Sequence, residues 1–283
     1  MKYFELDTQS QFEEKNLCLA IGNFDGFHKG HISILDSLKK IANQNNLPTA
    51  IMSFSPHPRE YFENKNENFN IYTKSEKINF LKKYNINIYI EFTFDKNLSE
   101  LSADQFVKEI LINKLNIKNV IVGKDFKFGK NRSGNFQILE NYSKENNFNV
   151  HLVESVMLSD GSSKFSSSII RENIKSGEME KVNFALGRPW HIQGIVIEGD
   201  KKAREINFPT ANIIPGKHIL PRKGVYCVEV CIDNENYLGV SNFGKRPTVD
   251  GSKLLLETHI FNFNKEIYGN ELTVRFLTFI RPE

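Results

Sequence analysis

Two histidines stand three residues apart in the segment AIGNFDGFHKGH, which spans Ala20–His31. The segment is typical of a strand that enters a glycine-containing turn and leaves as a helix, so His28 and His31 would share the first helical turn. Such a turn lets the backbone approach a phosphate, and the helix N-terminus adds free N–H groups and a positive dipole end. Two imidazoles there would donate hydrogen bonds to phosphate oxygens as charge builds in a transition state.

Other interpretations of this pattern stay open. The two histidines could lie on a solvated helix face or form half of a metal site, although zinc would require further Cys or carboxylate ligands, and none stands out nearby. The segment is not the GxxxxGK[ST] phosphate loop, because no Lys-Ser or Lys-Thr follows the glycine. The motif alone therefore indicates a nucleotide site without establishing one.

Three further segments follow the histidine motif along the chain: SFSPHP (Ser53–Pro58), VGKDFKFGKNRSG (Val122–Gly134) and FSSSIIRE (Phe165–Glu172). In this order the four motifs resemble the prokaryotic bifunctional riboflavin kinase/FMN adenylyltransferases, also called FAD synthetases. The HxGH element alone marks the wider nucleotidylyltransferase superfamily. The FDG prefix and the DFxFG block make the resemblance more specific.

The resemblance implies a role for each matching residue. His28 and His31 would stabilise the triphosphate and the pentavalent α-phosphorus of ATP, and Arg171 would neutralise phosphate charge through its planar, permanently charged fork. The residues implied at the ATP phosphates are Gly22, Asn23, Phe24, Asp25, Gly26, Ser166, Ser167, Ser168 and Arg171. Those implied beside the flavin are Asp125, Phe126 and Phe128. Taken without the resemblance, Asp125–Phe128 is a turn with two core aromatics, and the serines are a helix cap.

The segment GIVIEGDKKAREINFPTANI (Gly194–Ile213) resembles the riboflavin kinase signature. The family uses the Thr and Asn that match Thr210 and Asn212 to hold Mg²⁺ and the ATP phosphates, and Mg²⁺ prefers such oxygen ligands. Ala203 and Asn207 stand where the family has glycine, so the phosphate loop is expected to close less well. The ATP-binding residues implied here are Gly194, Gly199, Ala203, Pro209, Thr210 and Asn212.

Further motifs continue the kinase resemblance: GVY (Gly224–Tyr226), SNFGKRPTV (Ser241–Val249) and LETHIFNFNKEIYG (Leu256–Gly269). Glu257 falls where the family keeps its catalytic base, which would take the proton of the ribityl 5′-hydroxyl as that oxygen attacks the γ-phosphorus. Without the surrounding motifs, Glu257 would be an ordinary strand glutamate. Arg246 is interpreted as either a substrate contact or a surface ion pair.

The elements that would position these residues change character near residue 187. Before Gly187, strand-like and helix-like segments alternate, which favours a doubly wound parallel sheet with helices on both faces. After it, short β-rich segments follow one another, which favours a small barrel or sandwich, and the resemblance implies a six-stranded antiparallel β-barrel. The predicted class is therefore α/β with a boundary near residue 187, and the resemblance implies an FMN adenylyltransferase domain over 1–186 and a riboflavin kinase domain over 187–283. The C-terminal helix usual in the family is missing from the sequence.

The predicted elements are as follows. Strands before the boundary are Leu17–Ile21, Thr49–Phe54, Ile86–Phe92, Asn119–Val122 and Phe148–Val153. Helices are His28–Asn43, Lys74–Tyr84, Ala103–Leu115 with Ser102 as N-cap, Ser167–Ser176 and Glu178–Leu186. Strands after the boundary are His191–Glu198, Gly224–Ile232, Tyr237–Phe243, Leu254–Phe261 and Glu271–Ile280.

Composition sets the remaining expectations. The chain has 283 residues, 40% hydrophobic and 25% charged, with a net charge of +3 and no long basic block, so no nucleic acid partner is expected. No apolar run approaches a membrane span, so no membrane partner is expected. The cysteines Cys18, Cys227 and Cys231 form no CxxC pair, which favours a reducing, cytoplasmic location.

The sequence thus predicts an enzyme that phosphorylates riboflavin to FMN and adenylylates FMN to FAD, with ATP as co-substrate and Mg²⁺ as cofactor. Two alternatives remain. One is an FMN adenylyltransferase whose kinase module has decayed at Ala203 and Asn207. The other is a flavin-binding or flavin-sensing protein, which would need neither a base nor a phosphate clamp.

Overall fold

The computed structural model describes residues 1–63, 68–157, 163–198, 209–248 and 251–283. Residue contacts divide the chain into two compact units. The first unit comprises Met1–Asn66 and Lys74–Phe165, and the second comprises Glu67–Thr73 and Ser166–Glu283. The chain therefore passes between the units at three places along its length.

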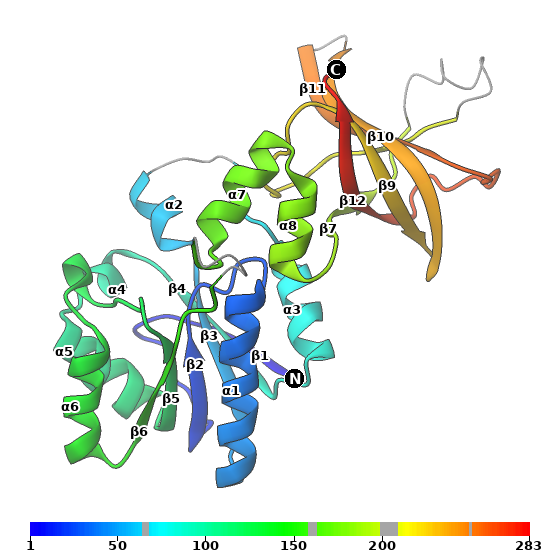
Figure 1. Ribbon diagram of the computed structural model, residues 1–283. Coiled ribbons are helices and arrows are strands. Elements are labelled where there is room, and N and C mark those ends of the chain that lie inside the picture. The colour runs from blue at the N-terminus through cyan, green and yellow to red at the C-terminus, as the bar shows by residue number, and fades with distance from the viewer. Residues whose placement is uncertain (64–67, 158–162, 199–208, 249–250) are drawn as a thin grey trace. The chain divides into compact units, whose positions relative to one another are not determined.

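The first unit is built on a parallel sheet of six strands in the order β1-β4-β3-β2-β5-β6 (Figure 1). Strand β2 is fully buried and lies between β3 and β5, so the chain winds outward from it in both directions. Ligands of such sheets bind beyond the carboxyl ends of the strands, at this switch in strand order. The strands are β1 (Lys2–Leu6), β2 (Leu17–Ile21), β3 (Thr49–Ser55), β4 (Ile88–Thr93), β5 (Ile117–Gly123) and β6 (Asn149–Val153).

Helices flank this sheet, and their apolar faces close its core. Helix α1 packs on β2, β3 and β5, and buries Leu35, Leu38 and Ala42 along one face. The helices are α1 (Lys29–Asn45), α2 (Pro58–Glu63), α3 (Lys74–Lys83), α4 (Lys96–Glu100), α5 (Ala103–Gln105), the π-helix η1 (Phe106–Lys114), the 3₁₀ turn η2 (Lys130–Arg132) and α6 (Phe136–Asn146).

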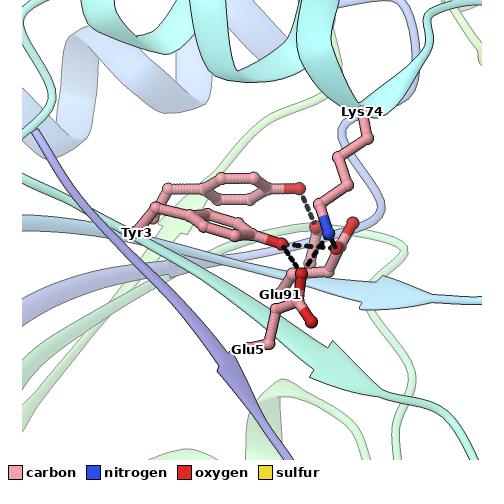
Figure 2. Close-up of polar contacts among 6 residues, drawn as sticks. Tyr3, Glu5, Lys74 and Glu91 are labelled. Carbon is pink, nitrogen blue, oxygen red and sulfur yellow. Dashed lines mark hydrogen bonds and ion pairs between the residues drawn. The ribbon is translucent and has the colours of Figure 1, made fainter.

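A polar cluster ties the edge of this sheet to the start of α3 (Figure 2). The Tyr3 hydroxyl donates to Glu91 at 2.7 Å and to Glu5 at 2.8 Å. Lys74 forms ion pairs with Glu5 and with Glu91, the latter at 3.1 Å. Because Glu91 is only 8% exposed, these partners supply the hydrogen bonds and opposite charge that a buried carboxylate requires.

The second unit contains an antiparallel sheet of six strands that curls into a half barrel, in the order β7-β12-β9-β10-β11-β8. Buried and half-buried residues alternate along β9, which places Tyr226, Val228 and Val230 in the core of the half barrel. The strands are β7 (Trp190–Ile195), β8 (Ala211–Ile213), β9 (Gly224–Ile232), β10 (Glu235–Thr248), β11 (Gly251–Ile260) and β12 (Glu271–Arg281).

Two helices, α7 (Ser167–Ser176) and α8 (Met179–Leu186), belong to the second unit. The Asn183 amide donates to the carbonyl of Phe276 at 2.8 Å, and its oxygen accepts from the backbone N–H of Trp190 at 2.8 Å. The Trp190 indole donates to the carbonyl of Ile71 at 3.1 Å. These bonds tie α8 and residues 68–73 to the half barrel.

The structure confirms the predicted fold class, with a parallel α/β sheet followed by an antiparallel curled sheet. Ser102 caps its helix as predicted, in a capping box with Gln105, but most of the helix beyond it is π-helical. Strand β1 and helix α6 were not predicted: the five residues of β1 give little signal, whereas the helical spacing of apolar residues in α6 was overlooked. Within the described part of the chain, no helix has both the length and the apolar character needed to cross a bilayer.

Candidate functional site

The turn after β2 is strained and held in place by buried aromatic rings. Phe24, Gly26 and Phe27 have φ angles of 45°, 86° and 46°, and the positive values are unfavourable for the two phenylalanines. Both Phe rings are 1% exposed, and the ring of Phe27 stacks on Phe80 of α3 with centroids 4.3 Å apart. Strain that is fixed by packing in this way is common where the backbone must take one shape for a ligand.

His28 and His31 lie together at the N-terminus of α1, as the sequence predicts. Their rings are stacked, with centroids 3.7 Å apart and an interplanar angle of 21°. His28 is the N-cap of α1, and its Nδ1 atom accepts a hydrogen bond from the backbone N–H of His31 at 3.3 Å. A neutral imidazole that accepts at Nδ1 carries its proton on Nε2, so Nε2 is the donor that His28 can offer to a ligand.

Gly30 contributes to this geometry, a role that was not predicted from the sequence. A Cβ atom at this position would lie 3.1 Å from two ring atoms of His28. A side chain there would therefore push on the His28 ring. The signal was available in the sequence, because a glycine inside the first turn of a helix is unfavourable and needs a local reason.

One polar side chain of the same turn indicates a ligand. The Oδ1 atom of Asn23 is buried and has no hydrogen-bond partner among the described residues. Asp25 is fully buried in the same turn. Buried acceptors are normally paired, so Asn23 fits a site that a ligand donor completes. Across the described ranges, no group of three His, Cys, Asp or Glu side chains is arranged to hold a metal.

The segment predicted to seat the flavin leaves β5 as a turn. Asp125 is exposed and forms an ion pair with Lys164, and the hydrogen bond from Lys164 lowers the pKa of this carboxyl. The ring of Phe128 is 6% exposed and packs on Phe106 at 5.3 Å, and a Cβ at Gly134 would lie 2.5 Å from it. Phe128 is thus a core residue, and its ring stacks at 5.5 Å on that of Phe126, which is half-buried.

The serine-rich segment lies at the start of α7 in the second unit. Ser166 is the N-cap and accepts from the backbone N–H of Ile169 at 3.3 Å. Arg171 is 7% exposed; its Nε donates to the carbonyl of Phe69 at 2.9 Å, and its guanidinium lies 3.8 Å from the centroid of the Phe69 ring. The roles of Ser166, Ser167, Ser168 and Arg171 toward a nucleotide stay predictions.

The structure brings Glu257 and the PTAN segment together in the second unit. Strand β8 pairs with β11 so that Asn212 is the direct cross-strand neighbour of Glu257. The backbone carbonyl of Asn212 accepts from the N–H of Ile197 at 2.9 Å. His259, two residues after Glu257, donates from Nδ1 to the carbonyl of Pro209 at 3.0 Å. These contacts fix the PTAN segment beside the predicted base.

The oxygen atoms of this segment fit the predicted Mg²⁺ ligands. Asn212 is 4% exposed, and its Oδ1 atom has no hydrogen-bond partner among the residues that are described. Thr210, half-buried, precedes it by two positions. A buried amide oxygen without a partner among the described residues, two positions after a threonine, suits a cation that prefers oxygen ligands.

The glycine-loop predictions have different outcomes. Gly194 lies in β7, where a Cβ atom would be 2.2 Å from Cγ2 of Ile213, so packing alone requires glycine there. Its contact with phosphate stays a prediction. Gly199, Ala203 and Asn207 lie outside the described residues.

Two protein-family models match the chain. One, described as FAD synthetase, covers residues 10–169, and the other, described as riboflavin kinase, covers residues 186–283. Neither model covers residues 170–185, which form most of α7 and α8. The domain boundary at residue 187 stays a prediction.

Three relatives carry the name bifunctional riboflavin kinase/FMN adenylyltransferase. The protein of Haemophilus influenzae is 41% identical over 94% of this chain and 86% of its own length. That of Buchnera aphidicola subsp. Schizaphis graminum is 40% identical over 95% and 86%, and that of Escherichia coli K12 is 34% identical over 97% and 87%. A crystal structure described as a macrolide-efflux protein from Streptococcus pneumoniae matches with a TM-score of 0.89 and 28% identity, over 99% of this chain and 91% of that one.

Proposed function

Because the chain belongs to the family of bifunctional riboflavin kinase/FMN adenylyltransferases, we propose that the two sites described above perform its two reactions. The protein phosphorylates riboflavin to FMN and adenylylates FMN to FAD, and ATP is the co-substrate of both steps. The proposal concerns which residues carry each step, the metal that assists them and the cell compartment.

Adenylyl transfer is assigned to the turn after β2 and the N-terminus of α1. A phosphate oxygen of FMN attacks the α-phosphorus of ATP, and the bond from that phosphorus to the departing pyrophosphate breaks. The Nε2–H of His28 and the imidazole of His31 donate to the phosphate oxygens, where charge grows in the transition state. Positioning and charge stabilisation are the main requirements of such a transfer. Arg171 keeps the role that the resemblance implies, which is neutralisation of phosphate charge.

Phosphoryl transfer is assigned to Glu257 and the PTAN segment. The Glu257 carboxylate takes the proton of the ribityl 5′-hydroxyl, the hydroxyl oxygen bonds to the γ-phosphorus of ATP, and ADP leaves. Thr210 and Asn212 would hold Mg²⁺, which when bound neutralises charge on the transferring phosphates. The observation that carries this assignment is the cross-strand pairing of Glu257 with Asn212, whose amide oxygen is buried and unpaired among the described residues.

A cytoplasmic location is part of the proposal. Its support is chemical: Cys18, Cys227 and Cys231 are all free thiols, and ATP is the co-substrate.

The proposal is tested by incubating the protein with ATP and either riboflavin or FMN, with Mg²⁺ or with excess EDTA, and separating riboflavin, FMN and FAD. From riboflavin we expect FMN and FAD with Mg²⁺ and neither with EDTA. FAD from added FMN, without phosphorylation of riboflavin, would mean a decayed kinase module. A protein that binds flavin and forms no product would be a flavin-binding protein, and product formation in EDTA would contradict the metal assignment.

A further inference from the structure

A row of three polar side chains crosses three neighbouring strands of the half barrel. Asn242 of β10 is the direct neighbour of Glu257 on β11, and Glu257 is the direct neighbour of Asn212 on β8. Residues directly opposite each other on paired strands project from the same face, with Cβ atoms about 4.5–5.5 Å apart. Asn242 and Asn212 therefore flank the predicted catalytic base on its two sides.

These strands pack into the core through the side chains of their opposite face, and Asn242 takes no part in that packing. Ser241 and Thr258, the next pair along, are buried and share a hydrogen bond at 2.7 Å. Phe243 and Leu256 are buried on that same face, 1% and 0% exposed. Because side chains alternate along a strand, Asn242 points away from this core, and the core does not need it.

The amide oxygen of Asn242 is nevertheless buried, and no described residue offers it a hydrogen bond. Asn212, at the other end of the row, has the same feature. Buried acceptors lose their hydration and are normally compensated by a donor or a cation. Two such oxygens, one on each side of Glu257, thus indicate that bound ligands occupy both sides, with Glu257 between them.

The chemistry of the phosphoryl transfer indicates which part of the substrates lies beside each oxygen. The metal and the phosphates of ATP belong to the Asn212 side, with the PTAN segment. The hydroxyl that Glu257 deprotonates lies between the phosphate and the rest of the acceptor, so the remaining polyol chain extends to the other side. Asn242 lies there, about 10 Å from Asn212 by two strand spacings. A polyol hydroxyl is a hydrogen-bond donor, which is what the amide oxygen lacks.

We propose that Asn242 binds the ribityl chain of riboflavin, by accepting a hydrogen bond from one of its secondary hydroxyls. This inference rests on the proposed role of Glu257 as the base. It assigns flavin-substrate recognition to a residue of β10 and orders the site along the sheet, from metal and ATP at β8 through the base at β11 to the polyol at β10.

The test measures riboflavin phosphorylation by the full chain carrying Asn242→Ala. Loss of one neutral hydrogen bond is expected to raise KM for riboflavin about 3- to 10-fold, while KM for ATP changes less than about twofold. Asn242→Asp retains an acceptor oxygen and should recover part of the loss in KM for riboflavin. Asn236→Ala, on the exposed start of the same strand, is the matched control, and an unchanged kcat for riboflavin phosphorylation reports that the half barrel is folded.

Deoxy analogues of riboflavin identify the partner hydroxyl. For one of the 2′-, 3′- and 4′-deoxy compounds, Asn242→Ala should cause no further loss, because the contact is already absent. An unchanged KM for riboflavin, or losses that add for all three analogues, would overturn the inference. An equal rise in KM for ATP would do the same and assign Asn242 to the nucleotide. If Glu257→Gln also phosphorylates at the parent rate, the proposed function itself fails, which is a separate result.

Discussion

The two sites of this chain are held by different kinds of backbone. The proposed adenylylation site takes its residues mainly from the single segment Gly22–His31, in which positive φ angles and a helix N-cap set the geometry. The proposed phosphorylation site takes Asn212, Asn242 and Glu257 from three strands, and the strand register sets the geometry. The first site should therefore be sensitive to local backbone changes, and the second to the chemistry of single side chains.

The largest effect is expected at the phosphorylation site. Glu257→Gln removes the base and keeps the size of the side chain, so kcat for riboflavin phosphorylation should fall by about 10²–10⁴-fold. FMN adenylylation by the same preparation should be unchanged. Glu271→Gln, at the exposed start of β12, is the control and should leave both rates as they are. If Glu257→Gln phosphorylated riboflavin at the parent rate, Glu257 would not be the catalytic base.

A second large effect is expected at the histidine pair. His31→Ala or His28→Ala should lower kcat for FAD formation from FMN by about 10²–10³-fold, as for a lost donor to a transition-state oxygen, and leave riboflavin phosphorylation unchanged. His28→Asn separates the two roles of His28, because Asn is a good N-cap. His28→Asn should be about 1 kcal/mol more stable to unfolding than His28→Ala, and FAD formation should be equally low in both variants. Recovery of FAD formation in His28→Asn would make His28 a cap and nothing more.

An effect of intermediate size is expected from a backbone substitution in the proposed adenylylation site. Gly30→Ala should maintain or raise stability, because alanine is favoured over glycine inside a helix by up to about 1 kcal/mol. The new methyl group would lie 3.1 Å from the His28 ring and should displace it by less than an ångström. FAD formation should therefore fall by about 3–30-fold, less than the ~10²-fold loss that a misplacement of a full ångström can cause. Thermal unfolding and FMN adenylylation, measured together, check this. Unchanged adenylylation would show that the His28 ring tolerates the contact.

The smallest effect concerns the edge of the first sheet. Burial and the hydrogen bonds to Glu91 and Glu5 raise the pKa of Tyr3, and the bonds of Lys74 to these carboxylates outweigh its burial and raise its pKa too. A raised pKa in the folded state gives stability that is complete below the ordinary value near 10 and is lost as the pH rises above it.

The advantage of the parent over Tyr3→Phe in free energy of unfolding should thus be constant from pH 7 to pH 9 and shrink above pH ~10. Urea unfolding at several pH values measures it. A constant difference up to pH 11 would mean that the Tyr3 hydroxyl is not held by the cluster of Figure 2.

The same comparison explains what the sequence could predict. His28, His31 and the turn before them are contiguous, so motif and geometry coincide, and the structure places both histidines at the start of a helix with their rings stacked. Asn242 could not be found, because strand register alone makes it a neighbour of Glu257, fifteen residues away in the chain. The packing of Phe80 on Phe27 escaped for the same reason, since a tertiary contact between distant residues leaves no local pattern. The fold class followed from the change of hydrophobic period near residue 187.

The central claim is that one chain carries two separable sites, and a mixing experiment tests it most directly. Glu257→Gln and His31→Ala are each incubated with riboflavin, ATP and Mg²⁺, alone and together, and the flavins are separated. Alone, Glu257→Gln should leave riboflavin unchanged and His31→Ala should accumulate FMN. Together they should form FAD, because FMN made by one protein is adenylylated by the other. Failure of the mixture to form FAD, or loss of both reactions in either single variant, would contradict the account.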